Sequence, residues 1–317
     1  MNASISKTFA KSKTDDLLTV DIIIYVKNAV KTINLALDSV ANNSNPRCSC
    51  IVVDGLSTDG TSEILLRRKN EISQLLIEPD NGAAEAANKG LALGNGDIVC
   101  FLMGDDLLKK GAIQKISQAF KDNPTAQIIS SGVEVEKINK EGSRELTLLR
   151  MGNENKLSLE NALKTPYTGA HYFRRRLLEN LGGFNHDFKY SHDRDLLMRA
   201  LQIGAPISVI NEPLYCYLSH SKSLTLFLNP QVALEFTKEH ITLADRWINL
   251  SSNQIFNKKI ASWQAQQIKE WAFLELRAGG ILRAAPRLIN SIIHRPKSIW
   301  FILDELVKYL RKKLLLK

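Results

Sequence analysis

Two adjacent carboxylates, Asp105 and Asp106, follow an apolar segment and are the clearest candidates for chemistry in this sequence. The segment, 98–103, reads Ile-Val-Cys-Phe-Leu-Met, which is typical of a buried strand. Neighbouring acids repel each other unless a cation or hydrogen-bond donors compensate. Hard divalent ions take carboxylate and phosphate oxygens. The pair therefore predicts an Mg²⁺ or Mn²⁺ site for a phosphate-bearing ligand, and the alternative is a solvated turn.

Polar residues also follow the other strands that the pattern predicts. Lys27-Asn28 follows a β-branched run over 19–26, Asp54 follows a strand at 50–53, and Asp80 lies just beyond a strand at 74–78. Ligands of open α/β sheets bind beyond the carboxyl ends of the strands. We therefore expect these side chains to meet at one edge of a sheet.

Segments with helical periodicity lie between these strands. Val30, Ile33, Leu37 and Val40 predict a first helix, which we expect Asn28 to cap. Further helices are predicted near 62–70, 83–93 and 111–121. Alternating strands and helices imply parallel crossovers in a doubly wound α/β sheet.

The second half of the chain is less regular. A strand is predicted at 126–135, then a charged loop to about Lys156 and a mixed segment over 165–217. From Pro230 onward the pattern is helical, so we place a soft boundary near Leu228. We expect a flexible N-terminus over 1–18, a catalytic domain over 19–228 and a helical C-terminal region over 229–317.

Four segments in order look like successive motifs of family 2 glycosyltransferases. They are Asp21-Ile22-Ile23-Ile24 with Asn28; Ile51-Val52-Val53-Asp54-Gly55-Leu56-Ser57-Thr58-Asp59-Gly60-Thr61; Glu78-Pro79-Asp80-Asn81-Gly82 with Asn88-Lys89-Gly90; and Gly96-Asp97 through Asp105-Asp106. The resemblance spans about 20–225. It implies a GT-A fold with a mixed sheet, a donor half over about 19–125 and an acceptor half over about 126–228. It also implies inversion of configuration and a nucleotide-diphosphate sugar donor, by family frequency a UDP-sugar.

The resemblance also assigns roles to individual residues. Tyr25, Asp54, Asp80 and Asp105 would line the nucleotide site, and Asp106 would hold the divalent metal on the diphosphate. Tyr25 stands where the family commonly has Thr or Pro. Gly55 replaces an acid that many members have.

Two of the acids in the second motif have a structural alternative. Asp54 and Asp59 could each cap a turn or a helix start, and for Asp59 we favour capping.

The acceptor side resembles the family at Leu181-Gly182-Gly183-Phe184-Asn185 and His192-Asp193-Arg194-Asp195. The resemblance implies that Asp193 is the general base. Asp195 and Arg199 are four residues apart on a predicted helix and are expected to form an ion pair, while the role of His192 stays open. His220 and Lys222 form a candidate loop over the diphosphate.

The basic charge lies mostly in the tail. The chain carries a formal charge of +9, and residues 281–317 hold nine Lys and Arg against Asp304 and Glu305, a net +7. Aliphatic and aromatic residues alternate with these bases, which favours amphipathic helices on an anionic membrane surface. The alternative is packing on the catalytic domain or on a second subunit. No nucleic-acid module accompanies the charge.

The sequence thus predicts a cytoplasmic enzyme, peripheral at the membrane, because it shows neither a secretion signal nor a span of about 18 apolar residues. It would move one sugar per cycle to a glycan or lipid-linked acceptor, since the Gln-x-x-Arg-Trp signature of processive members is missing. The rivals are a nucleotidyltransferase of similar fold and a catalytically silent nucleotide-sugar-binding scaffold at a membrane.

Overall fold

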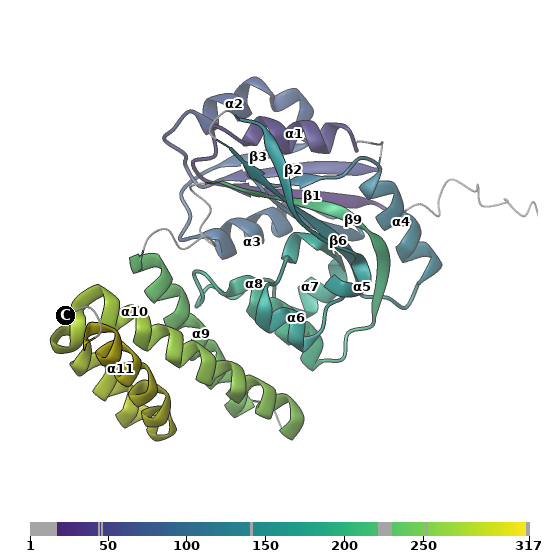
Figure 1. Ribbon diagram of the computed structural model, residues 1–317. Helices are drawn as coiled ribbons and strands as arrows, with labels where there is room; N and C mark the ends of the chain where they lie inside the picture. The colour runs from purple at the N-terminus through teal and green to yellow at the C-terminus, as the bar shows by residue number, and fades with distance from the viewer. Residues whose placement is uncertain are drawn as a thin grey trace, which may run out of the picture.

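The computed structural model is an α/β structure with one mixed sheet, helices on both faces of it, and a group of C-terminal helices to one side (Figure 1). It describes residues 18–43, 45, 47–139, 142–220, 230–250 and 253–314. The predicted flexible N-terminus up to residue 17 and the predicted boundary near Leu228 lie outside these ranges.

The sheet has nine strands in the order β3-β2-β1-β4-β8-β6-β9-β5, with β7 paired to β6. Pairing is parallel among β1–β4 and between β6 and β9, and antiparallel at β4–β8, β6–β8, β6–β7 and β5–β9. The predicted mixed sheet is therefore confirmed. The strands are β1 (Val20–Val26), β2 (Cys48–Asp54), β3 (Gln74–Ile77), β4 (Ile98–Met103), β5 (Leu107–Leu108), β6 (Ile128–Ile138), β7 (Arg144–Arg150), β8 (His171–Arg174) and β9 (Ile207–Ser219).

Two helical layers bury the two faces of the sheet. All seven residues of β1 are buried, and because successive side chains of a strand point to opposite faces, Ile22 and Ile24 join one core while Ile23 and Tyr25 join the other. Helices α1, α2 and α4 cover the first face, and α3, α6, α7 and α8 the second (Figure 1). Their bounds are α1 (Ile33–Ala41), α2 (Thr61–Arg67), α3 (Ala83–Leu93), α4 (Ala112–Asp122), α6 (Leu159–Lys164), α7 (Arg175–Leu181) and α8 (His192–Gln202), with a short α5 (Gly152–Asn155) before α6.

Two local predictions are wrong. The segment expected to be a charged loop contains β7, an edge strand whose side chains are largely exposed, so no apolar run announces it. Asn28 does not cap α1: the N-cap is Thr32, and Asn28 adopts a left-handed backbone (φ 56°) while its Oδ1 accepts a hydrogen bond from the Thr58 N–H. Asn tolerates this conformation better than most residues, so it serves the turn instead.

The C-terminal region is helical as predicted, with α9 (Pro230–Leu250), α10 (Gln254–His294) and α11 (Ile299–Leu314). Gly280 interrupts α10 with a non-helical backbone. Trp247 and Trp263 pack with Met198 of α8, which joins these helices to the acceptor half of the sheet domain. None of the helices in the described ranges has the length and apolarity that crossing a membrane requires.

Candidate active site

The carboxyl ends of four neighbouring strands form the candidate site. The register pairs Val26 with Asp54 and Tyr25 with Met103, so the ends of β2, β1 and β4 are level with one another. Neighbouring strands lie about 4.8 Å apart. The loops that carry Asp54 and Asp105 therefore leave the sheet at the same edge, as the sequence predicts.

Asp105 and Asp106 follow β4 but occupy different environments. Asp106 is fully buried and accepts hydrogen bonds from the Tyr215 hydroxyl and from the Leu218 N–H (2.9 Å), both on β9. The side chain of Asp105 is 34% exposed and lies 3.1 Å from His220 Nε2. Adjacent acids thus point into two compartments, one internal and one open to solvent.

Electrostatics at this pair suit a divalent cation. Burial, and then the charge of Asp105, raises the pKa of Asp106 well above its ordinary value, although hydrogen bonds from Tyr215 and Leu218 oppose the rise. In the described part of the chain no Lys or Arg makes a salt bridge with either acid. A divalent ion would supply positive charge to either carboxylate, and carboxylate oxygens are ligands that Mg²⁺ and Mn²⁺ accept, so these residue types fit such an ion.

Tyr25 connects this pair with Asp193. The Tyr25 side chain is buried and packs against Phe101 with the ring centroids 6.5 Å apart. Burial first, and then the charges of Asp193, Asp106 and Asp105, raises the pKa of Tyr25. The charges of these three carboxylates thus act on one buried phenol, although they come from segments almost ninety residues apart in the sequence.

Asp193 is the second residue of α8, at the end of the helix that favours negative charge. Its Oδ1 accepts a hydrogen bond from the Arg194 N–H (2.6 Å), and its Oδ2 accepts one from the Thr168 hydroxyl (3.3 Å). The predicted Asp195–Arg199 ion pair is confirmed, with Nε and Oδ2 2.8 Å apart.

His192, whose role the sequence left open, is buried beside the start of this helix. Its ring lies edge-on to Phe184 with the centroids 5.5 Å apart, and its Nδ1 lies 3.2 Å from the Lys189 carbonyl oxygen. These contacts assign it to packing at the start of α8.

Asp54 and Asp59 both order the loop after β2. The fully buried Asp54 accepts hydrogen bonds from the Ser57 N–H (3.2 Å), the Ser57 hydroxyl (2.5 Å) and the Ser62 hydroxyl. Asp59 accepts from Thr61 at the start of α2 and from the Val30 N–H, so the predicted capping role is confirmed. The role of Asp54 toward a nucleoside stays a prediction.

Asp80 lies against the loop after β2. A Cβ built on Gly55 would collide with the Asp80 carboxylate and come within 3.3 Å of Lys27 Cδ. Asp80 Oδ1 accepts a hydrogen bond from the Gly82 N–H (2.9 Å). The structure thus brings Asp80, Gly55 and Lys27 together; they follow β3, β2 and β1, which are three, two and one strands away from β4 and Asp105.

His220 reaches this edge through its contact with Asp105, whereas Lys222 lies outside the described residues. Sequence reasoning missed Tyr215 and Thr168, which contact the candidate metal ligand and the candidate base. Tyr215 stood in a strand-like Tyr-Cys-Tyr segment, but nothing local to either residue identifies its carboxylate partner.

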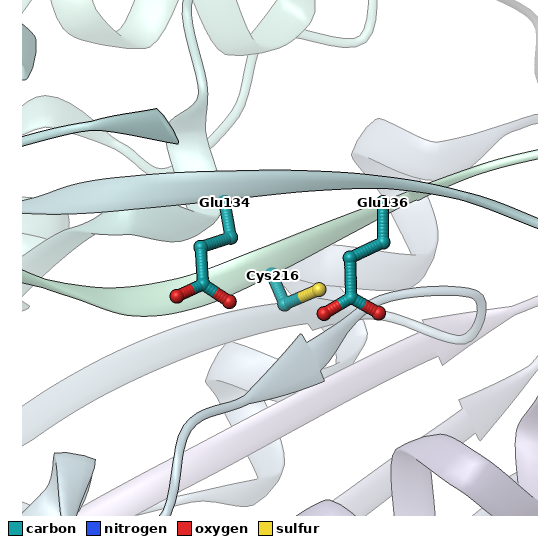
Figure 2. A group of neighbouring side chains, drawn as sticks. All are labelled: Glu134, Glu136 and Cys216. Carbon is teal, nitrogen blue, oxygen red and sulfur yellow. The ribbon is translucent and has the colours of Figure 1, made fainter. Parts of the chain in front are cut away.

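A second group of metal-binding residue types lies on β6 and β9, where Glu134 and Glu136 approach Cys216 (Figure 2). Glu134 forms a 2.6 Å salt bridge with Lys109, and Glu136 lies 3.4 Å from Arg144. Burial, and then the charge of Glu136, raises the pKa of the Cys216 thiol to about 12, so it stays protonated at neutral pH. Local cations already neutralise these acids, and we assign no metal here.

Comparison with known proteins agrees with the fold. Residues 21–182, just over half of the chain, match the family described as Glycosyl transferase family 2, and the chain belongs to this family. An uncharacterised glycosyltransferase of Haemophilus influenzae is 26% identical over 229 residues, which are 69% of this chain and 76% of that protein. A putative teichuronic acid biosynthesis glycosyltransferase of Bacillus subtilis, TuaG, is 37% identical over 99 residues, 30% of this chain and 39% of that one.

Solved structures show the same fold. The S. aureus protein TarS (residues 1–349) superposes with a TM-score of 0.60 at 19% identity, covering 87% of this chain and 79% of that one. The mannosyltransferase PcManGT from Pyrobaculum calidifontis, solved with GDP-Man and Mn²⁺, gives 0.59 at 20% identity and covers 94% and 87%. The predicted GT-A fold, the family and the class of enzyme, a glycosyltransferase, are confirmed.

Proposed function

We propose that this glycosyltransferase moves a single sugar, with inversion, from a nucleotide-diphosphate donor to a glycan or lipid-linked acceptor in cell-surface polysaccharide or glycolipid biosynthesis. The observation that carries the proposal is the placement of Asp54 and of Asp105 and Asp106 at the same edge of the sheet, where the register holds the ends of β2, β1 and β4 level. The names of two relatives, in teichuronic acid and O-antigen biosynthesis, support the pathway class. The UDP-GlcNAc and GDP-Man complexes of TarS and PcManGT support a nucleotide-sugar donor, and we favour UDP.

On the donor side, Asp80 and Lys27 would contact the nucleoside and its phosphates, and Asp54 would hold the loop beside them. Asp105 would reach the ribose and Asp106 would hold Mg²⁺ or Mn²⁺, as the Mn²⁺ complex of PcManGT supports. When bound, such an ion offsets the negative charge that develops on the leaving nucleoside diphosphate. His220 and Lys222 would close over the diphosphate.

On the acceptor side, Asp193 would take the proton of the attacking hydroxyl. The hydroxyl oxygen then bonds to the anomeric carbon on the face opposite the breaking bond to the diphosphate, which inverts the configuration. The hydrogen bonds from Thr168 and from the helix backbone orient the carboxylate for this step. General base catalysis contributes about 10²–10⁴-fold in rate.

The test begins with a thermal-shift screen of UDP-glucose, UDP-GlcNAc and GDP-mannose with Mn²⁺, because a ligand of the folded state raises its apparent stability. Release of nucleoside diphosphate is then followed for the donor that binds. We expect Asp106→Asn to lose the metal-dependent rate, and Asp193→Asn to keep donor binding but lose about 10²–10⁴-fold in kcat.

The rival functions predict other results. A silent nucleotide-sugar-binding scaffold would bind a donor and release no nucleoside diphosphate. A nucleotidyltransferase would form a nucleotide sugar from a nucleoside triphosphate and a sugar phosphate, with release of pyrophosphate.

The proposed membrane contact rests on the surface of the last two helices. On α11, Trp300, Leu303, Val307 and Leu310 recur at helical spacing and are exposed, Trp300 by 74%. On α10, Leu282 is 91% exposed, and Ile289 and Ile293 are exposed as well. Exposed apolar stripes of this kind mark interaction sites.

Only part of the tail charge is available for lipid. Arg287, Arg295 and Lys308 are paired with acids of the helical region. Among the tail bases whose side chains the structure describes, Arg283, Lys297 and Arg311 make no salt bridge. Bases near an anionic bilayer contribute about 1 kcal/mol each, so we propose that the cytoplasmic face of an anionic membrane covers this stripe.

Flotation with phosphatidylglycerol-containing vesicles tests this contact. We expect the Trp300→Ser, Val307→Ser double variant to bind less, while Leu66→Ser, which removes an exposed leucine from α2, binds as the wild type does. Equal flotation of the wild type and the double variant refutes the membrane contact. If the wild type and Leu66→Ser form a concentration-dependent dimer and the double variant does not, the stripe contacts a second copy of the chain instead.

A further inference from the structure

A carboxylate from the C-terminal helices binds the segment that precedes the candidate base. Glu239 of α9 accepts hydrogen bonds from three consecutive backbone N–H groups: Oε1 accepts from Lys189 (2.9 Å), and Oε2 accepts from Tyr190 (2.8 Å) and Ser191 (3.0 Å). Consecutive N–H groups that converge in this way form an anion-binding concavity. Glu239 therefore supplies the anion for this concavity from another part of the chain.

This contact lies at the start of α8, where the N-cap side chain offers no hydrogen bond of its own. Ser191 is the N-cap residue, yet its hydroxyl makes no capping hydrogen bond and is buried without a partner. The first N–H groups of a helix need acceptors from outside it. Glu239 satisfies the N–H of the N-cap residue itself, and Asp193 follows two residues later.

Packing holds Glu239 in place. Three residues before it, Phe236 contacts Tyr190 with the ring centroids 5.9 Å apart. Next to it, His240 lies between Phe236 and Trp263, at 4.5 and 5.0 Å, and its Nδ1 lies 2.7 Å from Gln267 Oε1. These contacts hold the part of α9 that carries the Glu239 carboxylate.

We propose that Glu239 is a positioning residue, which fixes the start of α8 and thereby aims Asp193 at the acceptor hydroxyl. This inference rests on the proposed role of Asp193 as the base. It makes the C-terminal helices a part of the acceptor side of the enzyme, in addition to any contact with a membrane. Displacement of a catalytic group by about 1 Å can cost about 100-fold in rate.

Full-length variants test the positioning role. The donor is the one found in the thermal-shift screen, and the assay follows release of nucleoside diphosphate. The value of kcat is calculated per UDP-binding site, so that misfolded protein is not counted. Glu239→Ala should lower kcat about 10–100-fold and leave the donor KM within about twofold. Glu239→Gln should lose less, because an amide oxygen in the Oε2 position still accepts from Tyr190 and Ser191. Glu235→Ala, which removes an exposed acid one turn earlier on α9, should behave as the wild type.

A double variant shows whether Glu239 acts through Asp193. Effects of residues that act as a unit are not additive. In a protein that already carries Asp193→Asn, the addition of Glu239→Ala should therefore lower kcat by less than about twofold. Losses that multiply in the double variant, an unchanged kcat in Glu239→Ala, or a donor KM that rises as kcat falls would each overturn the inference.

The two proposals fail separately. If Asp193→Asn keeps the wild-type kcat, the base assignment falls, and the positioning role falls with it. If Asp193→Asn is impaired and Glu239→Ala is not, only the positioning role is refuted.

Discussion

Gly55 determines how closely Asp80 approaches the end of β2. Many members of the family have an acid at this position, and here any side chain would meet the Asp80 carboxylate. A second acid would also repel Asp80. The glycine at this position thus permits the observed position of Asp80, and we treat the two residues as one feature of the proposed nucleotide site.

Gly55→Ala should weaken donor binding without unfolding the protein. The new methyl group must push Asp80 away, and a lost hydrogen bond to a charged group costs about 1.5–3 kcal/mol, or roughly 10–100-fold in affinity. The donor KM and the thermal shift with UDP measure the effect. Asp80→Ala is the matched comparison. If Asp80→Ala weakens donor binding and Gly55→Ala does not, the close approach of the two residues does not affect donor binding.

At the next scale, a buried ion pair ties β1 to α7. Asp21 on β1 is buried, lies 2.6 Å from Arg175 Nη2, and accepts a hydrogen bond from the Gly96 N–H (2.7 Å). Arg175 also donates to the Leu91 and Gly96 carbonyl oxygens. One side chain thus joins the first strand, the end of α3 and the loop before β4.

Arg175→Met should lower the free energy of unfolding by about 3–5 kcal/mol, because it leaves the Asp21 carboxylate buried without its partner. Urea denaturation measures the loss. Asp21→Asn in the same chain should restore part of it, since the residual charge disappears. Arg176→Met, a change at the exposed neighbouring position, should cost little, and an equal loss there would show that the ion pair is not the cause.

Across the molecule, two buried histidines are held neutral, one in each part of the fold. Burial lowers the pKa of His171 on β8 to about 4. Burial, and then the charge of Arg194, lowers the pKa of His240 on α9 to about 3, although a hydrogen bond with Gln267 opposes the shift. In the unfolded chain both would titrate near 6.5.

Stability should therefore be intact above pH 6.5 and fall as the pH drops toward 4, because below 6.5 the unfolded chain binds protons that the folded protein does not. Each histidine contributes roughly 1 kcal/mol per pH unit in this window. Melting temperatures and urea curves from pH 7 to 4 measure the slope. His171→Asn and His240→Gln should each reduce the slope by about one proton.

Local patterns were enough to predict most of the donor half of this fold. The β-branched runs of β1 and β2 and the apolar run of β4 are buried on both faces, so they are visible as continuous apolar segments, and the helix over Ala83–Leu93 repeats at helical spacing. β7 was not predicted, because its side chains are largely exposed and show no apolar pattern. It pairs with β6 through backbone hydrogen bonds, which do not depend on a particular side-chain pattern.

The amino-acid sequence was sufficient to identify the acids that end the strands, because strand ends follow from local hydrophobic patterning. Only the tertiary structure decides what each acid does. Asp54 is enclosed by serines of its own loop, Asp106 is buried beneath Tyr215, and Asp105 alone of the three faces solvent. Glu239 contacts its partners across 48 to 50 residues, and such contacts arise from packing between helices, which no local pattern encodes.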